Sequence, residues 1–579
     1  MRLPCVASGL RAGRRPLVSV LHGQHRTYNT AVIGAGITGL TAAWQLAQDP
    51  QCSQVTLYEK SSRLGGWLDS EVIPVDGGEV VFEYGPRTLR SASPASIPFL
   101  SLIVNLGIFD DLIATSKLSP AARNRFIYYP DRLVRLPSLD REGLRNLRST
   151  LKEPVFEGFL QGLLWEHAQP ARDPSEWAQD ESVASFISRR FNSHVADNLV
   201  SSVYHGIYAG DIDQLSAQTL MGGIRNLEGT GILAGLGLKA FTGSSTRLMD
   251  DFMALDAAPR SRDVLDHEDA IHRVAKESST FTFKRGVRQL IEALVAGLKH
   301  DANLGQIITE DKRRATYDRV ISAIPAPALA KLIAPTNHPT NVNPQKSMAL
   351  LQQHNYATTV MVVNLYYSDP NILPAEGFGY LIPRSIPFEQ NPECGLGVIF
   401  ASSSSTGQHP SMPSLSVSQD SAPGTKLTVM LGGHYWDGFK ENDYPDHDTA
   451  VDMARAMLRR HIGITQAPKV VRTRLQHNAI PQYTVGHLDR MYELSDAVRS
   501  EFDHRLVLGG NWYNGVGVGE CVRQGILAAT YGVGQRQLRT NIGDGNSPWK
   551  EYDYHNWELE GGITMPPVRL FESTKKDFA

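Results

Sequence analysis

The chain has 579 residues, more than a single hydrophobic core usually supports, so we expect two or three domains. Hydrophobic residues make up 41% of the chain and charged residues 20%, which are ordinary values for a globular protein. The formal net charge of −3 is close to neutral and gives no sign of a nucleic-acid partner, so we expect none.

Residues 1–27 differ from this average. No Asp or Glu precedes Asp49, whereas arginines stand at Arg2, Arg11, Arg14, Arg15 and Arg26. An acid-free, Arg-rich and Ser-containing start is typical of a mitochondrial transit peptide; a disordered basic tail is the alternative. No apolar run in the chain reaches the roughly 18 residues that span a bilayer, so any membrane contact is expected to be peripheral.

The segment Tyr28–Lys60 predicts a strand, a glycine-rich turn, a helix and a second strand. The turn reads Gly34-Ala35-Gly36-Ile37-Thr38-Gly39. In this pattern Gly34 permits a tight turn, Gly36 lets backbone N–H groups approach a pyrophosphate, and Gly39 lets helix and strand pack closely. The second strand ends at Glu59, where a carboxylate can accept both ribose hydroxyls. These features predict a dinucleotide site, and a structural βαβ unit without ligand is the alternative.

A second glycine motif, Ser62-Arg63-Leu64-Gly65-Gly66-Trp67, follows Glu59. A nicotinamide dehydrogenase does not need this motif, whereas proteins that hold FAD in an extended form carry it. The chain therefore resembles the flavin amine oxidase superfamily. The resemblance implies an α/β fold with a discontinuous Rossmann-like FAD-binding domain, a mixed-sheet substrate domain and a helical membrane-docking insertion.

Later segments are expected to return to the FAD-binding domain. They are a helix at 287–298, a buried strand at 320–324, a strand at 505–510 and a helix at 519–531. We therefore divide the chain into residues 28–105, 270–333 and 500–535 as the FAD-binding domain, 106–250 as the helical membrane-docking domain, 336–499 as the substrate-binding domain and 536–579 as a C-terminal extension.

Two stretches inside these domains receive an interpretation of their own. Residues 401–426 are rich in Ser, Pro and Gly, which favours a mobile surface loop. In the helical part, Phe159, Leu163 and Leu164 are interpreted as core residues rather than membrane anchors.

Within the superfamily, motifs in consecutive order resemble the family of oxygen-dependent protoporphyrinogen oxidases in its fungal mitochondrial form. They lie at 124–126, 206–211, 320–326, 377–383, 429–433, 480–483 and 514–518. The resemblance implies oxidation of protoporphyrinogen IX to protoporphyrin IX in haem biosynthesis, a six-electron reaction that uses FAD and three O2 and releases three H2O2. Another amine oxidase or desaturase of the superfamily is the alternative, as is a binding scaffold without chemistry.

The same resemblance implies the surroundings of the protein. It places the chain peripherally on the mitochondrial inner membrane, at the intermembrane-space side. It also suggests a homodimer and a ferrochelatase-type downstream partner, neither of which the sequence itself decides.

The resemblance also carries residue roles for the substrate. It implies that Arg125 pairs with a propionate, which an arginine can do bidentately. Apolar and glycine positions that match the family's macrocycle-binding residues are Gly206, Phe378, Gly379, Leu381, Ile399 and Met430. Without the resemblance these would be a surface arginine, turn glycines and ordinary core residues. No side chain is assigned a catalytic role, because proton loss can pass along the conjugated rings to solvent.

For the cofactor, the glycine motifs and the resemblance together assign a longer set of residues. These are Gly34, Ala35, Gly36, Ile37, Thr38, Gly39, Glu59, Lys60, Arg63, Gly66, Trp67, Gly85, Pro86, Arg87, Thr88, Asn511, Val516, Gly517 and Val518. We expect FAD to be held non-covalently, because Cys521 lies outside the pattern through which covalent oxidases attach it. The cysteines show no metal-ligand spacing, so no metal is expected.

Two departures from the family stand out. The chain is short between Lys299 and Val320, where relatives have a longer β-excursion that touches the adenine, which puts that contact in doubt. Trp512 stands where relatives more often carry a smaller residue, so the packing around the isoalloxazine is expected to differ.

Overall fold

The computed structural model describes residues 27–91, 96–137, 151–169, 179–242, 245–259, 261–300, 304–308, 315–334, 344–530 and 570–573. Residues 1–26, which hold nearly all of the expected transit peptide, lie outside them, as does most of the C-terminal extension.

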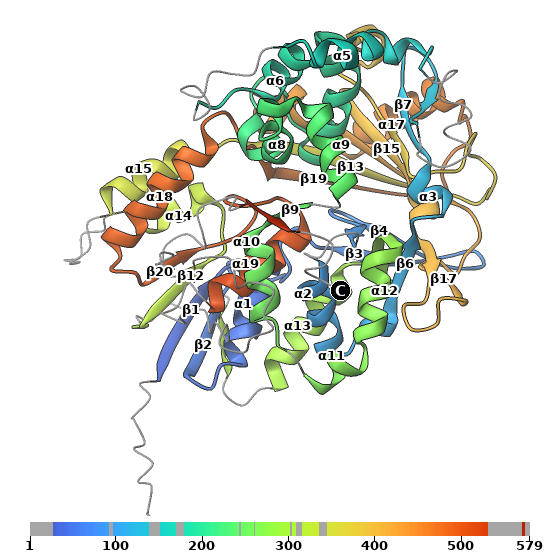
Figure 1. Cartoon of the computed structure of the whole chain (residues 1–579). Coiled ribbons are helices and arrows are strands. Elements are labelled where there is room, and N and C mark those ends of the chain that lie inside the picture. Colours follow the sequence, from blue (N-terminus) through green and yellow to red (C-terminus); the bar gives the residue numbers. More distant parts are fainter. Residues whose placement is uncertain are drawn as a thin grey trace, which may run out of the picture.

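A five-stranded parallel sheet occupies the lower half of Figure 1, with the strand order β11-β2-β1-β12-β20. Its strands are β1 (Tyr28–Ile33), β2 (Cys52–Tyr58), β11 (Leu304–Ile308), β12 (Arg319–Ser322) and β20 (Leu506–Leu508). The chain moves from β1 to β2 on one side and later returns to β12 on the other side. The carboxyl ends of β1 and β12 therefore form the switch point at which sheets of this kind bind ligands.

Helices cover both faces of this sheet, as is usual for parallel sheets. One face packs on α1 (Ile37–Ala47), α13 (Arg288–His300) and α19 (Val518–Thr530), and α2 (Ser96–Asn105) joins the same core. The other face packs on α14 (Ala326–Leu332), α15 (Gln345–Gln353) and α18 (His487–Glu501). Three segments far apart in the sequence thus build one Rossmann-like unit. Trp512 packs in the core of the second face, beside α14, α15 and α18.

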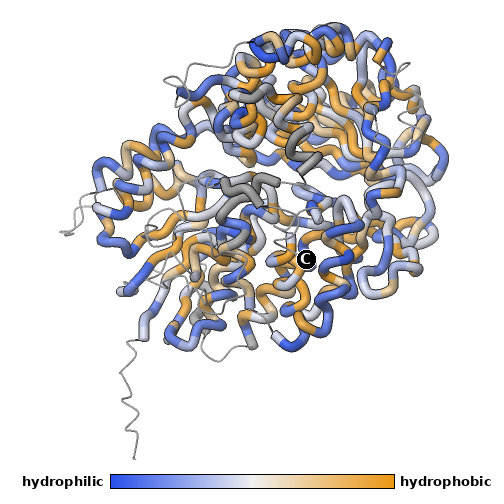
Figure 2. Tube along the Cα trace, in the orientation of Figure 1, coloured by the Kyte–Doolittle hydropathy of each residue, from blue (hydrophilic) through white to orange (hydrophobic). Residues whose placement is uncertain are grey.

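The upper half of Figure 1 contains a seven-stranded sheet with the order β19-β13-β18-β15-β14-β7-β8. Its strands are β7 (Arg125–Tyr128), β8 (Leu133–Arg135), β13 (Ala357–Tyr367), β14 (Gly379–Leu381), β15 (Gly395–Phe400), β18 (Thr425–Gly432) and β19 (Val470–Pro481). The sheet is mixed because β14 and β7 run parallel while the other pairs are antiparallel. One face forms an apolar core with α17 (His447–Ile462). Figure 2 shows these interior strands as mostly apolar, with hydrophilic residues on the outer turns.

The interpretation of residues 401–426 as a mobile loop is wrong. The segment contains α16 (Ala401–Ser404) and a hairpin of β16 (Thr406–Gln408) and β17 (Ser416–Ser418). Through β16 the hairpin extends an antiparallel sheet made of β6 (Leu112–Ser116), β10 (Ser278–Phe283) and β5 (Leu89–Arg90). The Ser- and Pro-rich composition was misleading because the strands are short and pair with partners distant in sequence.

Residues 420–422 then fold back onto the hairpin of β3 (Ser70–Val75) and β4 (Gly78–Glu83). The carboxylate of Asp420 accepts from the Val81 N–H at 2.8 Å and also pairs with Lys426. The segment is therefore anchored on both sides.

The part at 106–250 contributes β6 to the sheet of β5 and β10, and β7 and β8 to the seven-stranded sheet, before it becomes helical. Its helices are α3 (Pro120–Arg123), α5 (Phe159–Glu166), α6 (Val183–Arg190), α7 (Ser201–Tyr208), α8 (Ala217–Arg225) and α9 (Ile232–Thr242). Leu164 is 81% exposed, so its interpretation as a core residue is wrong, while Phe159 and Leu163 are half-buried.

Before the chain returns to the five-stranded parallel sheet, β9 (Ser245–Leu248) leads into α10 (Met249–Ala257), α11 (Arg262–Asp266) and α12 (Glu268–Glu277). The described end of the C-terminal extension, β21 (Leu570–Ser573), pairs antiparallel with β9. None of the helices that the structure describes is long and apolar enough to cross a bilayer.

Candidate functional site: a dinucleotide cradle beside an apolar sheet face

The glycines between β1 and α1 each meet a different steric demand. Gly34 has φ +99°, and a Cβ there would lie 2.8 Å from the Ile324 side chain at the end of β12. A Cβ on Gly39 would overlap the carbonyl oxygen of Gly34, whereas a Cβ on Gly36 would meet nothing within 4 Å. Gly34 and Gly39 are thus required by the fold itself. Gly36 has no such need, so its lack of a side chain leaves room for a ligand.

The N-terminus of α1 begins at this open position. Gly36 is its N-cap, no side chain caps the helix, and its first turn holds no acidic residue. Free N–H groups and the positive end of the helix dipole favour an anion such as a pyrophosphate. The geometry of the turn therefore fits the dinucleotide that its sequence predicts.

The second glycine motif packs directly against the first. The Gly65 N–H donates to the Ala35 carbonyl at 2.8 Å, and a Cβ on Gly66 would lie 3.3 Å from the Gly36 Cα. Gly65, a member of the second motif that was not among the predicted cofactor residues, is thus the residue that joins the two motifs. Arg63 folds over its own loop and donates to the carbonyls of Gly66 and Leu68. Its part is to hold the loop in shape.

Glu59 lies at the end of β2, beside the turn. Its carboxylate accepts from the Ala35 N–H at 2.8 Å and from the Ser61 N–H at 2.9 Å. Each carboxylate oxygen keeps a further lone pair, so hydroxyl groups of a ribose can still donate to it. Lys60, also predicted here, is exposed. The short 299–320 region supplies β11, an edge strand beside β2, and the described part of it gives no other strand that could contact an adenine.

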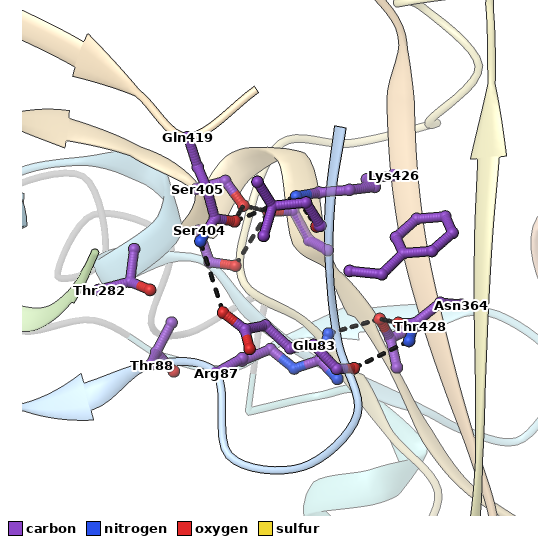
Figure 3. A pocket seen from close by; sticks show the side chains of 13 residues that line it. Glu83, Arg87, Thr88, Thr282, Asn364, Ser404, Ser405, Gln419, Lys426 and Thr428 are labelled. Carbon is purple, nitrogen blue, oxygen red and sulfur yellow. Dashed lines mark hydrogen bonds between the residues drawn. The ribbon is translucent and has the colours of Figure 1, made fainter. Parts of the chain in front are cut away.

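The predicted residues Gly85, Pro86, Arg87 and Thr88 cross from the cradle to the seven-stranded sheet. A Cβ on Gly85 would overlap the carbonyl oxygen of Trp67, so the two predicted motifs touch. The buried Arg87 guanidinium donates to the hydroxyl of Thr428 on β18, which in turn contacts Asn364 on β13 (Figure 3). Burial lowers the pKa of Arg87 to about 10, and nearby Glu83 opposes that shift.

A small cavity of about 10 Å³ lies behind this segment, which is the space of about one water molecule. Figure 3 shows Glu83, Arg87, Gln419 and Lys426 around it. Burial raises the pKa of Glu83 to about 7, against the lowering effect of the Ser70 hydroxyl, the Val287 N–H, Arg87 and Lys426. The cavity is too small for a cofactor, so we interpret it as part of the polar network that supports residues 85–88.

The last predicted cofactor residues lead into α19. Asn511 precedes the turn, and Val516, Gly517 and Val518 open the helix. Gln524, buried on α19, accepts from the Gly510 N–H and donates to the Asn514 carbonyl. The Tyr483 hydroxyl donates to the Asn511 carbonyl at 2.6 Å and accepts from the Gly515 N–H at 2.8 Å.

Gln524 and Tyr483 thus fix the shape of the 510–515 loop. The sequence reasoning missed Gln524, although a glutamine within an otherwise apolar helix is a recognisable signal. Thr38 of α1 borders the same loop, because a Cβ on Gly509 would lie 3.4 Å from its side chain. The thiol of Cys521 is buried, and burial raises its pKa to about 12.

The predicted substrate residues come together on the other face of the seven-stranded sheet. Gly379 on β14 pairs with Arg125 on β7 and with Ile399 on β15. Leu381 pairs with Gly397, and Gly397 pairs with Met430 on β18. Paired residues of adjacent strands point to the same side of a sheet. Thr428, the partner of Arg87, lies on this side as well, so both sets of predicted residues border one surface.

Most residues of β15 and β18 are buried, but Ile399 and Met430 are not fully so. On β14, Gly379 and Tyr380 are buried while Leu381 is again only half-buried. The partly open apolar positions therefore form one group across three neighbouring strands. Phe378 precedes β14, and the guanidinium carbon of Arg125 lies 5.4 Å from the centre of its ring. The group can receive a flat apolar molecule with a cation at its edge.

Helix α7 closes one side of this group. A Cβ on Gly206 would lie 2.9 Å from the Leu381 side chain, so the helix and β14 nearly touch there. The ring of His205 contacts the Ile382 carbonyl at 2.7 Å and the ring of His434 at 2.9 Å. Burial lowers the pKa of His205 to about 3 and also lowers the pKa of His434, so burial favours the neutral form of both rings.

The motifs quoted from the sequence meet at the end of α7. The Gln482 amide donates to the Tyr208 carbonyl at 2.9 Å, and the His434 N–H donates to the Ala209 carbonyl at 2.8 Å. The segments 206–211, 429–433 and 480–483 are therefore parts of one spatial unit.

Comparisons with known proteins agree with this architecture. The family model of flavin containing amine oxidoreductases matches residues 37–531. The protoporphyrinogen oxidase of Schizosaccharomyces pombe is 32% identical over 507 residues, which cover 86% of this chain and 96% of the relative. The protoporphyrinogen oxidase of Homo sapiens is 30% identical over 508 residues, with 87% and 98% covered.

Solved structures share the fold at lower identity. A protein from Exiguobacterium sp. 255-15, provisionally named a protoporphyrinogen oxidase, superposes with a TM-score of 0.62 at 20% identity, covering 87% of this chain and 98% of that one. Cyclohexylamine oxidase from Brevibacterium oxydans gives 0.53 at 14% identity, with 87% and 98% covered. Because the family model spans most of the chain and relatives at 30% identity or more are matched nearly end to end, the chain belongs to the flavin-containing amine oxidoreductases and, within them, to the protoporphyrinogen oxidases.

Proposed function

We propose that this chain oxidises protoporphyrinogen IX to protoporphyrin IX in haem biosynthesis. Six electrons and six protons leave the substrate in three two-electron rounds, and three O2 are reduced to three H2O2. The observation that carries the proposal is the group of half-buried apolar residues on β14, β15 and β18, edged by Arg125 and bordering the Arg87 segment of the dinucleotide cradle. A flat apolar macrocycle with carboxylate arms needs this combination.

We propose that FAD is the cofactor and is bound non-covalently. The open position at Gly36, the uncapped N-terminus of α1 and the carboxylate of Glu59 fit its pyrophosphate and ribose. When bound, FAD supplies a two-electron acceptor that O2 can reoxidise.

We assign to the side chains of the protein the role of positioning the substrate and its surroundings, and no role in proton transfer. Arg125 holds a propionate, and Phe378, Leu381, Ile399 and Met430 exclude water from the faces of the macrocycle, beside Gly206 and Gly379. Gln524 and Tyr483 hold the loop that leads into α19. No side chain is proposed as a general base.

The proposed domain division keeps residues 28–105, 270–333 and 500–535 as the FAD-binding domain and 336–499 as the substrate-binding domain. For 106–250 we propose peripheral docking on a membrane, supported by the exposed apolar side chains Leu160, Leu164 and Trp165 of α5 and Leu233 and Leu236 of the adjacent α9. Four further statements stay predictions. They are the location at the mitochondrial inner membrane, the cleavage of residues 1–27, a homodimer and a ferrochelatase-type partner.

The full chain, purified with FAD, tests the function. Protoporphyrinogen IX is added anaerobically and then in air, while porphyrin fluorescence and H2O2 are followed together. We expect a bound flavin spectrum, slow porphyrin formation without O2, and about three H2O2 per porphyrin in air. A simple amine such as cyclohexylamine serves as the contrasting substrate.

Other outcomes would contradict the proposal in distinct ways. A colourless protein that takes up no FAD would indicate a binding scaffold. A flavoprotein that oxidises the amine but not the tetrapyrrole would indicate another amine oxidase.

A further inference from the structure

Arg384 directly follows the segment 377–383 and was not among the predicted substrate residues. Its guanidinium is bound to three carboxylates. Its Nε and Nη2 lie 2.8 and 2.7 Å from Oδ1 of Asp197, and its Nη1 lies 2.7 Å from Oδ2 of Asp213 and 3.4 Å from Oδ1 of Asp211. Within the described ranges of the chain, these carboxylates form ion pairs with no other cation. Three negative charges therefore share one arginine.

The three carboxylates lie on both sides of α7 in the sequence. Asp197 belongs to the π-helical segment η4 (Val195–Val200), which leads directly into α7, and the other two carboxylates follow the end of the helix. The backbone N–H of Arg384 also donates to the hydroxyl of Ser201, the first residue of α7, at 3.1 Å. Residue 384 thus binds the chain before α7, at its start and after its end.

Helix α7 is in direct contact with the half-buried group of predicted substrate residues. It packs against β14 and β15, and a Cβ on Gly206 would lie 2.9 Å from the Leu381 side chain. The ring of His205 contacts the Ile382 carbonyl at 2.7 Å. Leu381 and Ile382 shortly precede Arg384 in the chain. A movement of α7 away from Arg384 is therefore also a movement away from Leu381.

We propose that Arg384 is a positioning residue, which fixes α7 against β14 and thereby sets where the helix meets a macrocycle bound on the half-buried face. The inference rests on the proposed function and deepens it, because it names what holds one side of the substrate site. Arg384 acts through α7 and not on the ligand, since its guanidinium is already occupied by carboxylates. Without it, the three carboxylates would repel one another and push the two ends of α7 away from β14.

The test compares variants of the flavin-loaded full chain. They are Arg384→Gln, Arg384→Lys, and Arg384→Gln combined with Asp197→Asn and Asp213→Asn. The matched control is Arg460→Gln. Arg460 of α17 pairs with Glu393 at 3.0 Å and is 32% exposed against 24% for Arg384, but α17 covers the other face of the seven-stranded sheet.

Four properties are measured for each protein. They are kcat and KM for protoporphyrinogen IX and for its dimethyl ester, the flavin content per chain, Tm, and the amide hydrogen exchange of α7. The exchange measurement reports on the attachment of the helix without relying on any activity.

We expect Arg384→Gln to lower kcat/KM about ten- to a hundredfold, mainly through KM, because a displaced helix no longer fits the macrocycle. The factor should be the same for the diacid and the dimethyl ester, since Arg384 does not contact the ligand. Amide exchange in α7 should become faster, while the flavin content stays unchanged.

The other variants should grade this effect. Arg384→Lys should show an intermediate loss, because an ammonium cannot reproduce the fork of the guanidinium. Neutralising Asp197 and Asp213 should recover part of the loss of Arg384→Gln, because the repulsion is removed. Arg460→Gln should lower Tm to a similar extent but leave the kinetics and the exchange of α7 unchanged.

Several results would overturn the inference. An unchanged kcat/KM in the Arg384 variants would do so, as would an unchanged exchange of α7 or an equal kinetic loss in Arg460→Gln. A loss confined to the diacid would mean that Arg384 binds a propionate itself, and loss of flavin would assign it to the cofactor. If the unaltered protein and Arg460→Gln both fail to oxidise the tetrapyrrole, it is the proposed function that is wrong, and the exchange of α7 alone then decides whether Arg384 holds the helix.

Discussion

A substitution at Arg125 tests substrate binding separately from cofactor binding. Its guanidinium lies against the Phe378 ring, on the strand that pairs with β14. We expect Arg125→Ala to raise KM for protoporphyrinogen about ten- to a hundredfold, because a charge-assisted hydrogen bond is worth roughly 1.5–3 kcal/mol. Steady-state kinetics together with the flavin spectrum measure this, and an unchanged KM would remove Arg125 from the site.

Glu83 determines a pH dependence of stability. Its carboxyl is buried, with a pKa of about 7 in the folded chain against an ordinary value of 4.5. Between these pH values the folded state therefore binds more protons than the unfolded state. The contribution of Glu83 to the free energy of unfolding is complete below about pH 4.5 and is lost as pH rises through about 7. Glu83→Gln should abolish this contribution, which is about 3 kcal/mol at most.

Thermal unfolding of the two proteins between pH 5 and 8 measures the difference. The Tm gap between Glu83→Gln and the unaltered chain should change steadily in the variant's favour as pH rises. Parallel Tm curves would show that Glu83 titrates normally or stays charged in the fold.

At the scale of an element, the turn into α1 separates folding from cofactor binding. A Cβ on Gly36 meets nothing within 4 Å, whereas a Cβ on Gly39 overlaps the Gly34 carbonyl. Gly36→Ala should therefore keep the Tm of the cofactor-free protein but weaken FAD binding by tenfold or more. Gly39→Ala should lower that Tm itself. Calorimetry of the apoprotein and FAD titration distinguish the two, and a matching loss of stability in both variants would contradict this assignment.

Strand β14 offers a second contrast between neighbouring glycines. Gly379 has φ +138°, and a Cβ there would overlap the Val398 carbonyl and lie 2.9 Å from the Ile399 Cα, so Gly379→Ala should destabilise the sheet by more than about 1 kcal/mol. At Gly206 the crowding atom belongs to the flexible Leu381 side chain, so Gly206→Ala should mainly raise KM. Denaturant unfolding and kinetics together measure this. Equal stability of both variants would show that the strand tolerates a side chain at 379.

For the whole molecule, the exposed apolar side chains of α5 predict how the protein meets a membrane. Leu164 and Trp165 are 81% and 57% exposed, and burying them in a lipid interface would be favourable. The double variant Leu164→Ser with Trp165→Ser should reduce co-sedimentation with anionic lipid vesicles severalfold while activity in detergent is kept. Leu265→Ser, at a leucine of α11 that is 57% exposed, as Trp165 is, is the control, and equal loss in both would indicate a non-specific effect.

The sequence alone determined the flavin-side architecture. The glycine turn, the strands around it and the acidic residue after β2 are local patterns. Each can be recognised from residues that lie close together in the sequence. The mixed α/β fold and the family were predicted correctly for the same reason, since motif order and spacing are properties of the sequence.

Only the tertiary structure decided which residues share a surface. Residues 401–426 look like a loop but pair with β6, and Leu164 looks like core but is exposed, because strand pairing and burial depend on partners far away in the chain. The half-buried face around Leu381 and the Gln524 support of the 510–515 loop are likewise non-local. The periodicity of the sequence indicates on which side of its helix or strand a residue lies. Whether that residue meets core, ligand or solvent depends on which other elements pack against that side.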